Sequence, residues 1–137
     1  MRVFFEDGRY YDEIAPDNPN FNLGMVINHP TMFIPKGIME QHGYYDDSFQ
    51  ISCDLEICVR YSKKDITFKK ISDDILVDYE VGGISSQKPN IVIQEAHRIR
   101  KMYNLFKYFD FRYLKSLILL FIFGKKLSLF SHKKRYF

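Results

Sequence analysis

Apolar residues between positions 53 and 64 recur every three or four places, which is the period of an α-helix. This pattern predicts a helix over residues 53–64, with Ser52 as its N-terminal cap. Residues 36–42 and 90–108 are predicted to form two further helices. The first of these is expected to end at Gly43, because glycine readily adopts the backbone conformation that follows a helix.

Extended structure is predicted where apolar and polar residues alternate, or where short apolar runs lie between turn residues. Four segments fit this description: residues 3–5, 10–11, 66–71 and 75–79. A turn at residues 6–9 is expected to join the first two of them. Pro30 has no N–H to donate, so any strand around it lies at a sheet edge or is interrupted.

The C-terminal segment, residues 109–137, differs from residues 1–108, and we expect it to form a separate helical tail. Its longest apolar run covers residues 117–123, whereas a membrane-spanning helix needs about 20 residues. Lysines flank this run, so it fits an interfacial anchor on an anionic membrane, and it fits a last core helix equally well. Nucleic acid is not an expected partner, because the basic residues lie among aliphatic ones.

Charge is distributed unevenly along the 137-residue chain. Residues 1–97 hold 9 Lys and Arg against 16 Asp and Glu, whereas residues 98–137 hold 11 against one, so the basic end suits an anionic surface. Cys53 and Cys58 fit neither a disulfide framework nor zinc spacing, and the first residues lack the apolar stretch of a signal peptide. We therefore expect a cytoplasmic protein, peripheral at the inner face of the cell membrane if the tail is an anchor.

Four short motifs occur in order between residues 29 and 86. They are His-Pro-Thr-Met-Phe-Ile at 29–34, Gly-Tyr-Tyr-Asp-Asp-Ser-Phe at 43–49, Asp-Leu-Glu-Ile-Cys-Val-Arg at 54–60 and Val-Asp-Tyr-Glu-Val-Gly-Gly-Ile-Ser-Ser at 77–86. In this order and spacing they resemble the C-terminal, acceptor-side half of family 2 glycosyltransferases, over about residues 1–105. The resemblance implies an α/β chain with a partial GT-A fold, in which a mixed sheet carries flanking helices and is followed by the helical tail.

Asp54 occupies the position at which the resemblance implies the catalytic general base, at the start of an acceptor-side helix. A carboxylate there takes the proton of the acceptor hydroxyl as its oxygen attacks the anomeric carbon of the donor sugar. Cys53 stands where many members of the family have glutamate, so the local sequence is closer to the Ala-Asp-Tyr-Asp variant of the family. The alternative is structural, because an Asp in the first turn stabilises a helix by about 0.3–1 kcal/mol.

The resemblance implies substrate contacts from seven further residues: His29, Asp46, Asp47, Glu56, Gly82, Gly83 and Ser85. All of them except Ser85 also have a structural alternative. His29 fits a packed turn, and the pair Asp46 and Asp47 fits a turn of its own. Glu56 fits a solvated helix face, and the double glycine fits a tight backbone turn. Arg60 is expected to pair with a carboxylate or a phosphate, or to form a surface ion pair.

The resemblance also implies a nucleotide-sugar donor, a glycan or lipid-linked acceptor, and a divalent cation, Mg²⁺ or Mn²⁺, held by an Asp-x-Asp motif. No such motif precedes His29, and the neighbouring acids Glu6 and Asp7 lie in a predicted turn. We therefore expect a truncated half that binds donor weakly or not at all. The hypothesis is a glycosyltransferase of polysaccharide biosynthesis, and the alternative is a non-catalytic, membrane-peripheral remnant or binding module.

Overall fold

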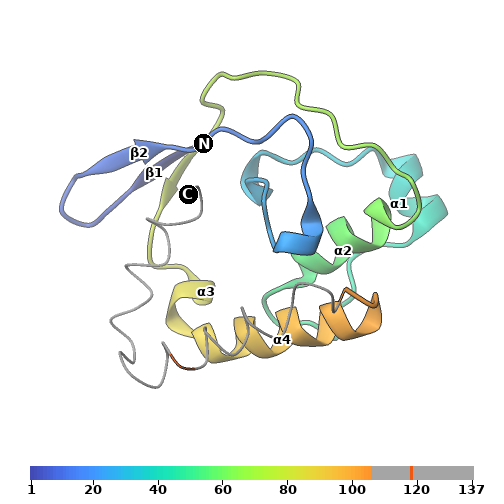
Figure 1. The fold of residues 1–137 in the computed structure, drawn as a ribbon. Helices are drawn as coiled ribbons and strands as arrows, with labels where there is room; N and C mark the ends of the chain where they lie inside the picture. The colour runs from blue at the N-terminus through green and yellow to red at the C-terminus, as the bar shows by residue number, and fades with distance from the viewer. Residues whose placement is uncertain (106–117, 119–137) are drawn as a thin grey trace.

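The computed structural model describes residues 1–105 and residue 118. This part of the chain is a small α/β protein, in which a three-stranded sheet lies to one side of the helices (Figure 1). The predicted tail, residues 109–137, lies outside the described residues except for residue 118. Among the residues that are described, no helix is both long enough and apolar enough to cross a membrane.

The sheet has the strand order β2-β1-β3, and its strands are Arg2–Phe4 (β1), Tyr10–Asp12 (β2) and Asp78–Glu80 (β3). Strand β1 pairs antiparallel with β2 and parallel with β3, which makes the sheet mixed, as predicted. The predicted turn joins β1 to β2, and Gly8 adopts a φ of 81° there, a conformation that glycine adopts without strain. Val3, in the central strand, is buried.

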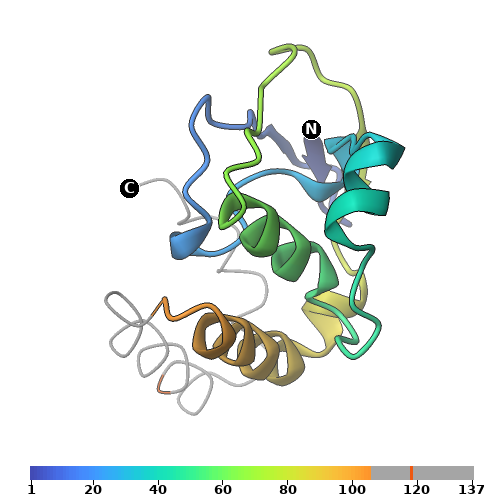
Figure 2. The same cartoon turned by 90° about the vertical axis from the view of Figure 1, so that its right-hand side faces the viewer.

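The described helices are Lys36–His42 (α1), Cys53–Ser62 (α2), Ile84–Gln87 (α3) and Pro89–Met102 (α4), together with two single 3₁₀ turns, Phe21–Leu23 (η1) and His29–Thr31 (η2). Helices α2 and α4 lie side by side (Figure 2). The core fills the space around α2, where Ile57 and Val59 are buried together with Ile99 of α4 and Phe21 of η1.

The prediction for α1 is confirmed at both ends, and the prediction for α2 is confirmed at its start. Ser52 is the N-cap residue of α2, as predicted, but its side chain makes no capping hydrogen bond to the helix. Helix α4 ends at Met102, before the predicted position 108, since Asn104 turns the chain with a φ of 57°. Residues 106–108 lie outside the described part.

The strand predicted at residues 66–71 is wrong, because within the described residues this segment pairs with no other strand. Side chains hold it instead: the Phe68 ring packs 4.7 Å from the Phe21 ring, between centroids. Lys70 forms ion pairs with Asp17 and Asp73. The strand predicted at 75–79 occurs as β3, shifted toward the C-terminus.

Candidate functional site

The first turn of α2 carries Asp54, whose two carboxylate oxygens have different surroundings. Oδ1 accepts a hydrogen bond of 2.7 Å from the backbone N–H of Leu55. Oδ2 lies 3.9 Å from Nδ1 of His29, the first residue of η2. The Asp54 side chain is 26% exposed and the His29 side chain 45%, so this pair lies at the surface and is open to a ligand.

Tyr45, in the segment between α1 and α2, completes this group. Its ring meets the His29 ring edge-on, with 6.4 Å between the centroids and an angle of 85° between the planes. Burial raises the pKa of the Tyr45 hydroxyl, and the nearby charge of Asp54 contributes to the same shift. Residues from η2, from the α1–α2 segment and from α2 therefore meet at one place, which we call the Asp54 site: His29, Tyr45 and Asp54.

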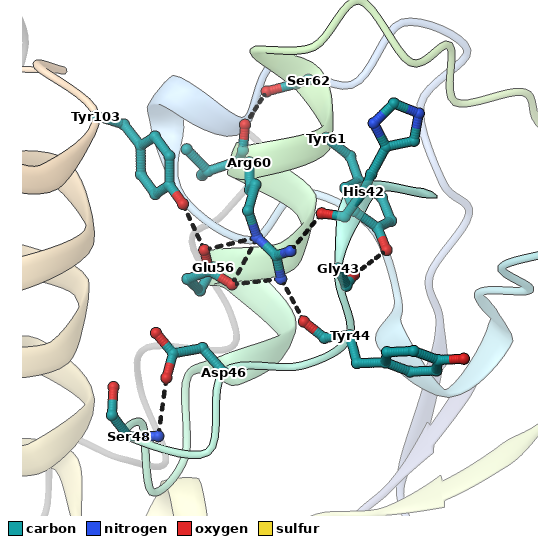
Figure 3. Close-up of polar contacts among 11 residues, drawn as sticks. His42, Gly43, Tyr44, Asp46, Ser48, Glu56, Arg60, Tyr61, Ser62 and Tyr103 are labelled. Atoms are coloured by element: carbon teal, nitrogen blue, oxygen red, sulfur yellow. Dashed lines mark hydrogen bonds and ion pairs between the residues drawn. The ribbon is translucent and has the colours of Figure 1, made fainter. Parts of the chain in front are cut away.

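A buried polar cluster is centred on Glu56 of α2 (Figure 3). Glu56 is only 2% exposed, so the interpretation of Glu56 as part of a solvated helix face is wrong. Its carboxylate is ion-paired with Arg60 one helical turn later, at 3.0 Å, and accepts a hydrogen bond from the Tyr103 hydroxyl. An unpaired buried carboxylate would be strongly destabilising, and these two partners compensate for its burial.

Arg60 connects this cluster to the segment that follows α1. Its guanidinium donates to the carbonyls of His42, at 2.7 Å, and of Tyr44, while it remains paired with Glu56. The Tyr61 hydroxyl donates to the intervening carbonyl, that of Gly43, at 2.7 Å. Three consecutive carbonyls are thus held by two neighbouring residues of α2 (Figure 3). Of the predicted alternatives for Arg60, pairing with a carboxylate is confirmed.

Glu95 of α4 holds the other end of the same segment. Its carboxylate accepts hydrogen bonds from the backbone N–H groups of Gln50, Ile51 and Ser52, at 2.6, 3.1 and 2.8 Å. Burial opposes the ionisation of Glu95, but these N–H donors outweigh it and hold its pKa below the ordinary value. A side chain 43 to 45 residues distant therefore holds the backbone that leads into α2, whereas the Ser52 side chain makes no capping hydrogen bond.

The remaining predicted contacts are distributed as follows. Asp46 accepts a hydrogen bond of 2.9 Å from the Ser48 N–H, which confirms its turn conformation. Asp47 is exposed in the same turn. Gly82 and Gly83 precede α3. The side chain of Gln87, the last residue of α3, donates a hydrogen bond to the Gly82 carbonyl and so joins this loop to α3. Within residues 1–105, Asp54 pairs with Leu55 and His29, and no hydrogen bond or ion pair joins it to this loop.

Ser85 is exposed in α3. Its substrate contact and those of the other predicted residues stay predictions, as does the role of Glu56, whose carboxylate is engaged inside the protein. Sequence analysis did not identify Tyr45, Glu95 or Tyr103. One signal was available for the buried cluster, because a Glu followed four residues later by an Arg is a favourable helical pair.

The cation implied by the resemblance is not assigned to residues of this structure. Within residues 1–105, no three His, Cys, Asp or Glu side chains come together in a group suited to a metal ion. We therefore derive no chemical step through a metal. Comparisons of the chain with models of protein families, with curated proteins and with solved structures find no match.

Proposed function

We propose that this chain forms the acceptor-side part of a family 2 glycosyltransferase, which transfers a sugar from a nucleotide-diphosphate sugar to a polysaccharide or lipid-linked acceptor. The observation that carries the proposal is the partly exposed Asp54 carboxylate at the start of α2, 3.9 Å from His29. The four ordered motifs of residues 29–86 support the same class of enzyme.

The two oxygens of Asp54 suit a general base. The Leu55 N–H binds Oδ1 and fixes the carboxylate, which leaves Oδ2 directed toward the exposed His29. In the proposed reaction, Oδ2 of Asp54 accepts the proton of an acceptor hydroxyl. At the same time, the hydroxyl oxygen of the acceptor forms a bond to the anomeric carbon of the donor sugar. The bond from the anomeric carbon to the phosphate oxygen breaks, and the nucleoside diphosphate leaves with the electron pair.

The donor and its divalent cation are proposed to be held by a donor-binding half that supplies an Asp-x-Asp motif. The described residues are proposed to supply the acceptor side. This side consists of the Asp54 site and of the hydrogen bonds of Arg60, Tyr61 and Glu95 that fix the backbone between α1 and α2. Transfer therefore requires both halves, and the isolated chain is expected to bind donor weakly.

A second candidate is a non-catalytic binding module. It is favoured by the hydrogen bond between Asp54 and Leu55, because a carboxylate in a first helical turn stabilises its own helix by about 0.3–1 kcal/mol without any catalytic role. On this alternative, the chain keeps the acceptor-side fold and binds a ligand without transferring a sugar.

The test is sugar transfer by the full chain, alone and co-expressed with the segment encoded immediately upstream of Met1. We expect release of UDP or GDP from a hexose donor, with labelled sugar appearing in an acceptor, in the co-expressed sample. Calorimetry with UDP- and GDP-hexoses measures donor binding in the same samples. If neither donor binding nor transfer occurs in either sample, the enzyme hypothesis fails and the binding module is favoured.

A further inference from the structure

Tyr45 is exposed although the backbone on both sides of it is fixed from inside the protein. Immediately before it, the carbonyls of His42, Gly43 and Tyr44 are held by Arg60 and Tyr61 of α2. That segment is anchored by a buried ion pair, so its position does not depend on surface contacts.

The backbone after Tyr45 is anchored as well. The Asp46 carboxylate accepts from the Ser48 N–H, and Arg98 of α4 donates to both the carbonyl and the hydroxyl of Ser48. The Arg98 guanidinium also lies 4.2 Å from the centroid of the Phe49 ring. A tyrosine held between two such anchors loses little backbone freedom when a ligand binds it, which favours affinity.

The surroundings of the Tyr45 ring combine an apolar face with polar groups. The residue is 40% exposed, its ring contacts His29 edge-on, and His29 in turn lies beside the Asp54 carboxylate. A pyranose ring has the matching character, because its C–H groups form an apolar face and its hydroxyls form a polar rim. Recognition sites for small ligands typically pair an aromatic surface with a few convergent polar groups in this way.

We infer that Tyr45 stacks against the terminal sugar ring of the acceptor, so that the acceptor recognised by this chain is a glycan, with its reacting hydroxyl placed toward Asp54 and His29. This inference rests on the proposed function and adds the chemical class of the acceptor's recognised end. Tyr45 is a binding residue here, and proton transfer is assigned to Asp54.

The experiment measures glycan binding by the full chain without any donor, on an array of oligosaccharides ending in hexoses or N-acetylhexosamines. The best ligand is then titrated against three variants, each checked by circular dichroism for an intact fold. Tyr45→Ala is expected to weaken binding about tenfold or more, whereas Tyr45→Phe keeps the ring and retains binding within about threefold. Tyr10→Ala removes a more exposed tyrosine, 57% against 40%, from β2 and is expected to leave binding unchanged.

The outcomes separate this inference from the proposed function. If glycan binding depends on the Tyr45 ring but no sample transfers sugar, the inference is supported and the enzyme hypothesis is rejected. If sugar is transferred and Tyr45→Ala leaves the KM for the acceptor unchanged, the enzyme hypothesis is supported and the inference is overturned. The inference is also overturned if no glycan on the array binds the wild-type chain, or if Tyr45→Ala and Tyr10→Ala weaken binding equally.

Discussion

Replacing Gly43 by alanine is expected to destabilise the protein strongly, for two separate reasons. Gly43 has φ 95° and ψ 149°, a backbone conformation that side-chain-bearing residues avoid at a cost of about 1–3 kcal/mol. A Cβ placed on Gly43 would lie 2.5 Å from Nη1 of Arg60, so the guanidinium would have to move. The Gly43 position is therefore restricted both by its own backbone and by the buried cluster.

The guanidinium cannot move freely, because it is paired with Glu56 and donates to the carbonyls of His42 and Tyr44. Losing one hydrogen bond to a charged group costs about 1.5–3 kcal/mol. Together with the backbone strain, we expect Gly43→Ala to lower the free energy of unfolding by about 3–5 kcal/mol. That is a large part of the total for a small domain, which is about 5–15 kcal/mol.

The assay is urea unfolding followed by far-ultraviolet circular dichroism and by tyrosine fluorescence, since the chain has ten tyrosines and no tryptophan. Gly37→Ala is the matched control, because nothing lies within 4 Å of an added Cβ there and the residue is in helix α1. It is expected to raise stability by up to about 1 kcal/mol. If the free energy of unfolding of Gly43→Ala lies within about 0.5 kcal/mol of the wild-type value, the hydrogen bonds that we describe around Arg60 are incorrect.

Two further predictions concern titration. Because the pKa of Glu95 is lowered in the folded state, its stabilisation is fully present above the ordinary value of 4.5 and is lost as the pH falls through the folded value. We therefore expect Glu95→Gln to be less stable than wild type at neutral pH, by a difference that shrinks in acid, as urea unfolding at several pH values would show; a difference that does not change with pH would contradict this. Burial raises the pKa of the Cys58 thiol to about 12, so iodoacetamide at pH 8 should modify the more exposed Cys53 first and Cys58 only after unfolding, as peptide mass spectrometry would show. Equal modification rates in the folded protein would contradict the burial of Cys58.

Local signals made some elements predictable from the sequence. Helix α1 ends where Gly43 follows it, and the hairpin forms around Gly8, because glycine fits both conformations and few residues are involved. The alternation at residues 66–71 is just as local, yet no strand forms there, because pairing needs a neighbouring strand and the described part of the chain places none beside it.

The site was predictable only in part, because its geometry depends on residues far apart in the sequence. Asp54 was predicted as a candidate from its motif, but its approach to His29, 25 positions earlier, depends on where the fold places η2 relative to α2. The burial of Glu56 depends on Tyr103 and on α4. The hydrogen bonds that Glu95 accepts depend on how α4 lies beside α2 and the residues just before it. A single helix pattern cannot distinguish a solvated carboxylate from one that an adjacent helix covers.

The most direct test of the proposed role of Asp54 is the rate of sugar transfer by Asp54→Asn in the co-expressed enzyme. Asp65→Asn is the matched control, because Asp65 is exposed just beyond α2 and its φ of 56° suits asparagine equally well. We predict that Asp54→Asn lowers kcat by about 10²–10⁴, with acceptor binding retained, and that Asp65→Asn has no effect. If the two variants transfer sugar at the same rate, Asp54 is not the general base.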